Sequence, residues 1–478
     1  MRAPLGPTLA LSRSLGALSR LRGGGGTSAP GKLLIRLDPG AIGALAGRLP
    51  QGSIVISATN GKTTTAAFTA GIFAQHGTSL VHNRAGANMA GGIASTLLRA
   101  ARSRGAIAGE LGLFEVDEFW LGDLLGQLRP RAILLGNLFR DQLDRYGELE
   151  SIAERWAGAL DTDPARAARL VLNADDPMVA DLGRVRDGGD VDAVIAGAQV
   201  IYYGVQDDSL ALAGMAHAAD AKHCRRCGNP YLFDAIYLGH LGHYHCPSCG
   251  QTRPTPTVTA TDVTLEGVRS ARFTLHTPAG AAEVRLALPG LYNVYNALAA
   301  AALATALEIP LPTIVAGLQA TPPAFGRAES VDLAGRELRI LLVKNPAGAN
   351  EVLRTLALEP GQHDLLGVLN DNTADGRDVS WIWDADFELL AGRLRRVTCA
   401  GSRAAELAVR LKYAGIDPAL IHVCDDLATA LDQAAAARPA DMTDGETETP
   451  LYALPTYTAM LALRQLLVSR GEARSAWS

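Results

Sequence analysis

The sequence predicts an α/β protein with two parallel-sheet domains in succession. Apolar strand-like runs alternate with helical stretches in both halves of the chain, a pattern typical of parallel sheets flanked by helices. A Gly-Lys-Thr turn follows the first of these runs, and two Cys-x-x-Cys pairs occur midway along the chain. With 478 residues, 48% of them hydrophobic, the chain is long enough for two or three domains with substantial cores.

Residues 1–48 are expected to form an N-terminal amphipathic helix and a linker. Leu11, Leu15 and Leu18 lie on one helical face with arginines nearby, and a run of glycines ends the helix. The segment lacks the long apolar core and the cleavage site of a secretory signal. Two interpretations remain open: the helix packs on its own domain, or it lies on an anionic membrane surface.

Residues 49–325 are expected to form the first domain, an ATP-binding domain. Its predicted elements are strands near Val55, at 132–136 and at 170–172, a cysteine-rich insert at about 205–265, short strands over 258–288 and an Ala-rich helix over 290–307. A Pro-Pro-Ala-Phe-Gly run then marks the domain boundary.

The most informative motif is a turn directly behind the apolar run 54–57. A strand, a tight turn and a helix that begins at Lys62 would place backbone N–H groups around a di- or triphosphate. We expect Lys62 to reach the β- and γ-phosphates and the Thr63 hydroxyl to hold Mg²⁺. An ordinary glycine turn is the alternative, since Ile56 occupies the position of the first glycine in the general phosphate-loop pattern. The expected nucleotide-binding residues of this turn are Thr59, Asn60, Gly61, Lys62, Thr63 and Thr64.

Polar and acidic residues follow the later strands of this domain. Glu115 comes directly after the apolar stretch 112–114, where a carboxylate can meet the Mg²⁺ held by Thr63. The polar runs 137–145 and 173–177 follow the next two strands. Ligands of open α/β sheets bind at this end of the strands. A solvated acidic turn and an Asp-Pro turn are the corresponding alternatives.

The four clustered cysteines predict a zinc site. The two pairs are separated by eighteen residues, and a glycine follows each pair. Two such turns give tetrahedral all-thiolate coordination with no open position, so the zinc would be structural and would stabilise the insert as a zinc ribbon. Nucleic-acid binding is disfavoured, because the net charge is -5 and basic residues in the insert are scattered. The expected zinc ligands are Cys224, Cys227, Cys246 and Cys249.

Residues 326–478 are expected to form the second, Rossmann-like α/β domain. The predicted strands cover 339–343, 365–369, 396–400, 421–423 and 451–454, and helical stretches such as 403–413 and 427–436 separate them. This length is that of an ordinary domain.

In order and spacing, these motifs resemble the Mur ligases, whose superfamily includes the folylpolyglutamate synthases. The resemblance implies an enzyme that uses ATP to make an acyl phosphate, which an amine then attacks. It also implies that Asn293 and Asn296 face the adenine, that Arg327 reaches the nucleotide, and that Glu115 serves Mg²⁺. The segments that carry it are Thr59–Thr64, Glu115, Asn137 with Asp141–Gly147, Asn173–Pro177, Gly290–Asn296 and Gly326–Arg327.

The sequence departs from the pattern of most Mur ligases in four ways, and these departures make it resemble the MurT family in particular. This resemblance extends over nearly the whole chain. The phosphate loop arrives by residue 59, so the UDP-binding domain of most Mur ligases is expected to be absent. The cysteine insert interrupts the central domain. Gln142 stands where many relatives have His, and Lys344–Gly348 replaces an Asp-x-Tyr-Ala-His-Asn-Pro element. The cysteine insert and the run 370–384 are the parts of the sequence most specific to this resemblance.

The MurT resemblance implies amidation of the α-carboxyl of D-glutamate in the lipid II stem peptide to D-isoglutamine, a step of peptidoglycan synthesis. It implies a heterodimer with a GatD-like glutamine amidotransferase subunit that supplies ammonia. Asp378 is expected to complete the catalytic triad of that partner. Asp371 and Asp375 are competing candidates, and capping of turns is the alternative for all of them.

Two other functions stay open. One is a stand-alone amino-acid ligase of the Mur or folylpolyglutamate type, and the other is a non-catalytic ATP-binding scaffold with a zinc module. Cysteines used for metal rather than disulfides indicate the cytosol. If the N-terminal helix binds lipid, the protein would lie at the inner face of the cell membrane.

Overall fold

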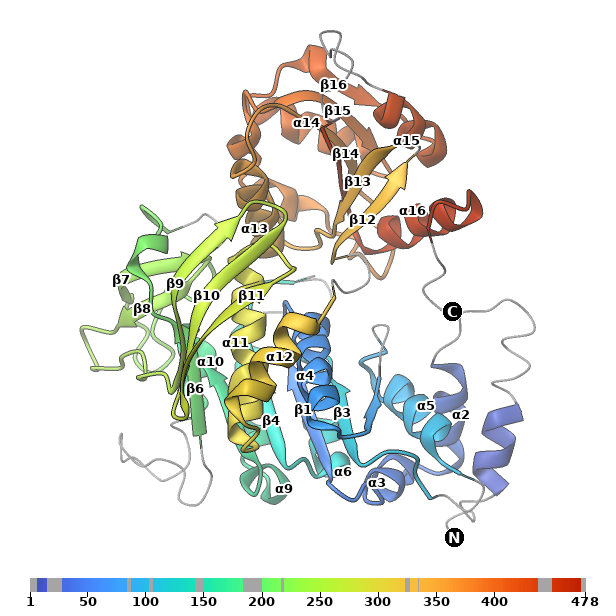
Figure 1. Cartoon of the computed structure of the whole chain (residues 1–478), viewed down its shortest axis with the longest axis vertical. Helices are drawn as coiled ribbons and strands as arrows, with labels where there is room; N and C mark the ends of the chain where they lie inside the picture. Colours follow the sequence, from blue (N-terminus) through green and yellow to red (C-terminus); the bar gives the residue numbers. More distant parts are fainter. Residues whose placement is uncertain are drawn as a thin grey trace.

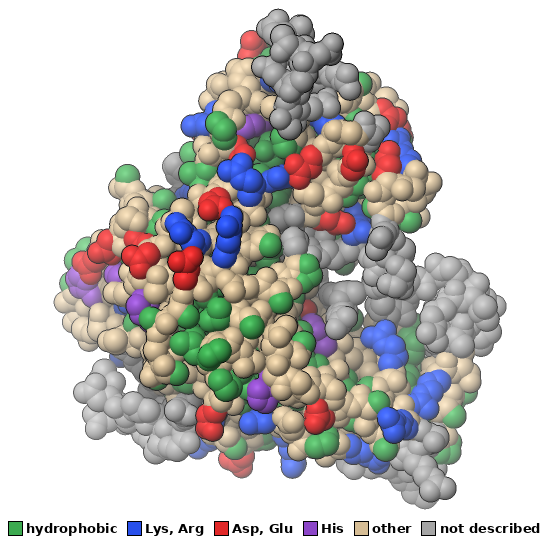
Figure 2. Space-filling model, viewed as in Figure 1, with side chains coloured by type: hydrophobic (Ala, Val, Ile, Leu, Met, Phe, Trp, Pro, Cys, Tyr) green, Lys and Arg blue, Asp and Glu red, His purple; other side chains and the backbone are tan. Residues whose placement is uncertain are grey.

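Two sheets with mostly parallel strands, one in each part of the chain, form the framework of the protein (Figure 1). The computed structural model describes residues 7–14, 28–83, 87–102, 106–141, 149–183, 200–215, 219–322, 327–333, 335–436 and 449–473. Acidic and basic side chains are interspersed over much of the face shown in Figure 2.

The first sheet has nine strands among the described residues, in the order β11-β10-β9-β6-β5-β4-β1-β3-β2. The strands from β2 to β9 in this order run parallel, whereas β10 and β11 are antiparallel to their neighbours. The carboxyl ends of the parallel strands therefore meet at one edge, where ligands of such sheets bind. The strands are β1 (Ser53–Ser57), β2 (Leu80–His82), β3 (Leu111–Glu115), β4 (Ala132–Leu135), β5 (Arg169–Asn173), β6 (Val200–Val205), β9 (Val258–Glu266), β10 (Ser270–Thr277) and β11 (Gly280–Leu286).

Helices cover both faces of this sheet, which explains why β1 is apolar without alternation. Ile54 and Ile56 pack into the core with α4 (Lys62–His76), α11 (Leu291–Ala306) and α12 (Leu311–Ala320), whereas Val55 packs into the core on the other face. Helices of that second face are α2 (Ala29–Leu37), α3 (Ala41–Ala46), α5 (Ala90–Ala100), α6 (Leu121–Leu128), α8 (Leu149–Leu160), α9 (Asp163–Arg166) and α10 (Pro177–Asp181).

The N-terminal helix is packed on this second face, at least over its described residues 7–14. Leu9 is buried in the same core as Leu34 of α2, whereas Leu11 is 56% exposed. The leucine that packs on the domain is therefore Leu9 and not Leu11; Leu15 and Leu18, predicted to share the face of Leu11, lie outside the described residues. Because α2 and α3 also contribute to this core, residues 29–46 are packed structure and not a linker.

The cysteine-rich insert lies between β6 and β9. It contains the short helix η1 (Asp208–Leu210) and the hairpin of β7 (Leu232–Leu238) and β8 (Leu241–His245), which forms a separate two-stranded sheet. The insert ends before Val258 and not at 265, because Val258 begins β9 and pairs with Tyr203 of β6 in the main sheet.

The second sheet has six strands among the described residues, in the order β12-β13-β17-β14-β15-β16. The five strands predicted here are confirmed as β13 (Arg336–Leu341), β14 (His363–Val368), β15 (Leu394–Ala400), β16 (Ile421–Val423) and β17 (Leu451–Pro455); β12 (Arg327–Leu333) was not predicted. The flanking elements are α13 (Pro346–Ala357), η2 (Ser380–Asp384), η3 (Phe387–Leu390), α14 (Ala404–Tyr413), η4 (Pro418–Leu420), α15 (Leu427–Ala436) and α16 (Tyr457–Ser469).

The turn between β9 and β10 connects the two parts of the molecule; Figure 1 shows it reaching toward α13. Val268 in this turn is buried in the core of the second sheet. Its backbone N–H donates to Glu359 Oε1 at 2.8 Å, and its carbonyl accepts from Arg339 Nη1 at 3.0 Å. Gly267 has a φ of 57°, and a Cβ there would lie 1.7 Å from Glu359 Oε1. This contact fixes the second domain against the first.

Among the described helices, none combines the length and the apolar character needed to cross a bilayer.

Candidate active site

The phosphate-loop turn has the predicted strand–turn–helix geometry. It leaves β1 at Ser57 and enters α4 at Lys62. Gly61 has a φ of 87°, and a Cβ there would lie 1.9 Å from Asn296 Oδ1. Only glycine therefore fits this position without displacing the side chain of Asn296.

Lys62 lies over its own loop. Its ammonium donates to the carbonyl of Ala58 and, at 2.9 Å, to Glu118 Oε2. Burial opposes ionisation of Glu118, but the charges of Lys62 and Lys344 outweigh this effect and lower its pKa. A charged Glu118 thus holds the Lys62 ammonium beside the loop.

Glu115 and Thr63 lie together, as the sequence predicts. Thr63 Oγ1 donates to Glu115 Oε2 at 3.0 Å. Asn83 fixes the backbone of Glu115, because its side chain bonds both the N–H (2.9 Å) and the carbonyl (2.8 Å) of that residue. The second carboxylate oxygen of Glu115 is buried and has no hydrogen-bond partner among the described residues, and His82 Nε2 lies 3.6 Å from it. A hydroxyl and a partly unsatisfied carboxylate are oxygen ligands of the kind that Mg²⁺ takes.

The second domain contacts the loop through Lys344 and Asn345. Asn345 Nδ2 donates to Asn60 Oδ1 at 3.0 Å. Lys344 donates to Thr59 O at 3.4 Å and forms an ion pair with Asp141. Two lysines from different domains therefore converge on the phosphate loop, each held by an acidic residue.

A pocket opens beside the loop, between the two domains. Asn60, Gly61 and Thr64 line one side of it. Other parts of its lining come from α11 (Tyr292, Tyr295, Asn296), from α13 (Ala347, Gly348, Glu351, Val352) and from the insert hairpin (Leu238, Leu241). An apolar pocket with a few convergent polar groups is the usual form of a small-molecule site.

Of the two residues predicted to face the adenine, one lines the pocket and the other supports it from behind. Asn296 lines the pocket, whereas Asn293 lies behind it, where its Nδ2 donates to Pro289 O at 2.7 Å and its Oδ1 accepts from Asn296 Nδ2 at 3.1 Å. The backbone of Arg327 begins β12, but its side chain lies outside the described residues.

Glu351 is an acid on the wall of the pocket. Burial raises its pKa, against the opposing charge of Arg354, whose Nη1 donates to Glu351 Oε1 at 2.6 Å. Sequence reasoning did not find Glu351, because an acid on an amphipathic helix reads as a solvated residue.

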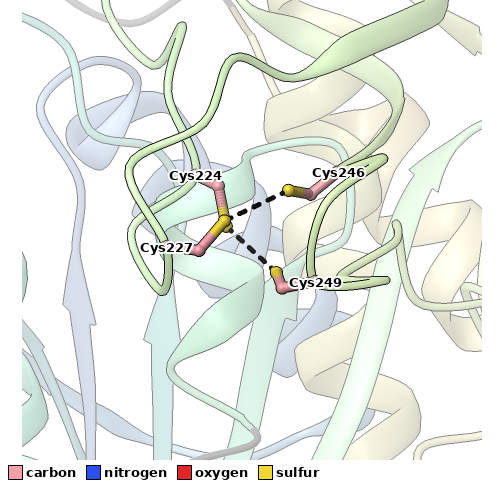
Figure 3. A group of neighbouring side chains, drawn as sticks. All are labelled: Cys224, Cys227, Cys246 and Cys249. Atoms are coloured by element: carbon pink, nitrogen blue, oxygen red, sulfur yellow. Dashed lines mark hydrogen bonds between the residues drawn. The ribbon is translucent and has the colours of Figure 1, made fainter.

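The four cysteines converge at one end of the insert (Figure 3). Their sulfurs all lie within 4.8 Å of one another. The Sγ atoms of Cys224 and Cys249 are 3.5 Å apart, as are those of Cys227 and Cys246, which is too far for a disulfide. This all-sulfur set fits a tetrahedral zinc ion.

Asp378 is exposed on the loop after β14 and is not part of the phosphate-loop cluster. It accepts from Ser380 N at 2.8 Å, and hydrogen bonds with Ser380 lower its pKa. Its competitors have other partners: Asp375 is buried and accepts from Thr458 N, and Asp371 accepts from Ser402 Oγ at 2.7 Å. Of the three, Asp378 is the most accessible to a second protein.

Sequence reasoning also missed the roles of Lys344 and Tyr295. Lys344 was noted as a departure from a motif, yet a lysine before Asn-Pro at the start of the second domain could have suggested a second cation for phosphate. Tyr295 OH donates to Asp175 Oδ2 at 2.7 Å, and Arg253 Nε donates to Asp175 Oδ1 at 2.6 Å. No local signal connects these three segments.

Two family models match the chain: Mur ligase middle domain over residues 56–209 and MurT ligase C-terminal over residues 342–460. The MurT subunit of lipid II isoglutaminyl synthase (glutamine-hydrolyzing) from Streptococcus pneumoniae strain R6 is 32% identical over 455 residues, or 95% of this chain and 94% of that protein. The same subunit from Staphylococcus aureus strain N315 is 32% identical over 406 residues, or 84% of this chain and 86% of that protein.

Solved structures confirm the Mur ligase-type fold. A pseudomurein peptide ligase type C from Methanothermus fervidus superposes with a TM-score of 0.60 at 22% identity, covering 88% of this chain and 79% of that one.

Proposed function

Because this chain belongs to the MurT family, we propose that it is the ATP-dependent synthetase subunit of a lipid II isoglutaminyl synthase. It amidates the α-carboxyl of D-glutamate in the lipid II stem peptide to D-isoglutamine, as part of peptidoglycan synthesis. The observation that carries this proposal is similarity to the MurT subunits over 95% of the chain. The stand-alone ligase remains the alternative, and no feature of the site favours it.

The phosphate loop supports carboxylate activation. The γ-phosphoryl group of ATP would pass to the substrate carboxylate, forming a P–O bond and releasing ADP, and ammonia would then form the C–N bond as phosphate leaves. Lys62 would leave its ion pair with Glu118 to bind the phosphates, and Lys344 would likewise leave its ion pair with Asp141. Both would offset charge on the transferring group, where catalysis is mostly positioning and electrostatics.

Thr63 and Glu115 would hold Mg²⁺. The buried, unpartnered oxygen of Glu115 is the observation that fits a cation there. When bound, Mg²⁺ would neutralise phosphate charge. Asn296 would contact the adenine, Asn293 would orient Asn296, and Arg327 would reach the nucleotide from the domain junction.

The four cysteines would hold a structural zinc ion, and the insert would be a zinc ribbon. The tip of the hairpin packs in the core of the first domain, whereas the cysteine end has only a small cluster around Tyr231 and Tyr244. A segment with so little apolar burial depends on its metal for folding. We also propose that residues 49–325 form the ATP-binding domain and that residues 326–478 form the second domain, which carries the interface with the glutaminase partner.

A GatD-like glutaminase subunit would supply the ammonia, since the relatives are named as one subunit of a glutamine-hydrolysing synthase. Asp378 would orient the catalytic histidine of that partner. Its exposure and its charged state suit this role.

The test is Asp378→Asn in the complex, assayed for amidation of lipid II with glutamine and with ammonium. We expect a roughly 10⁴-fold loss with glutamine, the cost of replacing a triad Asp by Asn, and unchanged activity with ammonium. Asp417→Asn is the matched control, because Asp417 is also exposed and accepts from the N–H two residues on, at 2.9 Å. Full glutamine-dependent activity of Asp378→Asn would contradict the assignment.

The N-terminal face would contact the membrane that carries the substrate. Lys32 and Arg36 on α2 and Arg99 on α5 are exposed on packed neighbouring helices, and Leu11 is exposed nearby in the N-terminal helix. Figure 2 shows basic side chains on this side of the molecule. Co-sedimentation should therefore be stronger with anionic than with neutral vesicles; equal binding would contradict this contact.

A further inference from the structure

The hairpin of the cysteine-rich insert reaches from the cysteine cluster to the pocket beside the phosphate loop. Leu238 and Leu241 flank its tip and line the same pocket as Asn60, Gly61 and Asn296. Both leucines are almost fully buried, with exposed fractions of 5% and 1%. The insert is thus a part of the pocket wall and not only a neighbour of it.

The tip is held tightly by the first domain. Gly239 has a φ of 59°, and a Cβ there would lie 2.8 Å from Phe139 Cε1. His240 is completely buried; its ring lies 4.6 Å from that of Phe139, and its Nε2 lies 3.5 Å from Asp176 Oδ2. Gly242 N donates to Asp175 O at 2.9 Å. These contacts leave the two leucines little freedom to move.

The same contacts connect the tip to the phosphate loop. Phe139, which packs on His240, donates its backbone N–H to Thr59 Oγ1 at 3.1 Å. Asp176, which faces His240, accepts from Leu138 N at 2.8 Å. The base of the insert makes a second connection, since Arg253 holds Asp175, and Asp175 holds the pocket residue Tyr295.

The cysteine end is anchored to the same short helix as the tip. Arg226, between the first two cysteines, donates to Asp181 Oδ1 at 2.8 Å, and Cys224 packs in one cluster with Ala180. Asp176 and Asp181 stand at the two ends of α10. The position of the hairpin therefore depends on both of its ends.

We propose that the hairpin tip is the apolar wall on which the adenine of ATP rests, and that the four-cysteine end fixes the position of this wall. The inference rests on the proposed function, because it takes the phosphate loop as the site of the triphosphate. A base bound beside Asn60 and Gly61 would lie in a pocket whose apolar lining includes Leu238, Leu241, Tyr292 and Val352. Apolar side chains against a planar base contribute affinity through buried area.

The test measures ATP and inorganic tripolyphosphate binding to the full chain by calorimetry with Mg²⁺. Tripolyphosphate occupies a phosphate loop without a base. We expect Leu238→Ala and Leu241→Ala to raise the Kd for ATP roughly tenfold and to leave the Kd for tripolyphosphate unchanged. Leu232→Ala is the control, because Leu232 is on the same hairpin but 52% exposed at the cysteine end. Leu241→Met keeps the volume and should retain ATP binding, which separates contact from misfolding.

A second arm removes the metal with a chelator, with release followed by a chromogenic zinc indicator. ATP affinity should fall and tripolyphosphate affinity should hold. Unchanged ATP binding in both leucine variants would overturn the proposal, as would an equal loss for both ligands. Lys62→Ala tests the proposed function separately from the role of the hairpin, and it should weaken the binding of both ATP and tripolyphosphate. If it weakens the binding of neither, the assignment of the phosphate loop is wrong, and so is the proposal for the hairpin tip.

Discussion

Gly267→Ala should loosen the contact between the two domains. The added Cβ would lie 1.7 Å from Glu359 Oε1, so the carboxylate must move away from Val268 N, to which it now bonds at 2.8 Å. Loss of a hydrogen bond to a charged group costs about 1.5–3 kcal/mol. A side chain in the left-handed conformation, here a φ of 57°, adds about 1 kcal/mol. The expected destabilisation is therefore about 3 kcal/mol.

The matched control is Gly392→Ala. Gly392 also has a left-handed φ, 73°, but a Cβ there meets nothing within 4 Å. Gly392→Ala should therefore destabilise the protein only by the cost of a left-handed alanine, about 1 kcal/mol. The two variants share the same chemical change and differ in the lost contact.

The assays are urea unfolding and hydrogen exchange of the amide of Val268. Gly267→Ala should lower the unfolding midpoint more than Gly392→Ala, and it alone should speed exchange at Val268. Equal unfolding midpoints, with the amide still protected in Gly267→Ala, would show that this turn does not hold the domains together.

Three further predictions concern acidic residues. Glu115→Gln should weaken Mg²⁺-dependent ATP turnover by roughly 100-fold, measured by phosphate release; unchanged turnover would remove Glu115 from the metal site. Glu351 has a raised pKa in the folded protein, so its contribution to stability is complete below its usual value of 4.5 and is lost as pH rises through the raised value. Glu351→Gln should therefore flatten the dependence of the unfolding free energy on pH above 4.5, and an unchanged slope would refute this. Asp364→Asn should destabilise by about 3–5 kcal/mol, because Asp364 is buried and paired with the buried Arg336; a loss below 1 kcal/mol in denaturant titrations would contradict a buried pair.

The parts of the site that the sequence predicted are those made by local chain. The turn at Lys62 and Thr63 needs only a strand, a glycine and a helix in succession, and the cysteine pairs carry their own glycines. Glu115 was found because a carboxylate ends an apolar run. Periodicity also predicted five of the six described strands of the second sheet, all except β12.

The parts of the site that could not be predicted from the sequence are contacts between residues that lie far apart along the chain. Lys344 meets Asp141 across 203 residues, and Tyr295 meets Asp175 across 120. Periodicity grouped Leu11 with Leu15 and Leu18 but could not show that the face that packs on the domain is the one that carries Leu9. Which face of a short amphipathic helix is buried depends on its neighbours and not on its own pattern.

Because β6 pairs with β9, the cysteine-rich insert between them is the crossover connection of two parallel strands. The two strands are parallel neighbours in the middle of the nine-stranded sheet. A chain that leaves one such strand must travel back along the sheet before it can enter the next, a return that a crossover helix usually makes. Here residues 206–257 make it. Deleting the insert would therefore require a replacement crossover of about a dozen residues or more, because residues 206–257 are the covalent connection between two adjacent strands of the sheet.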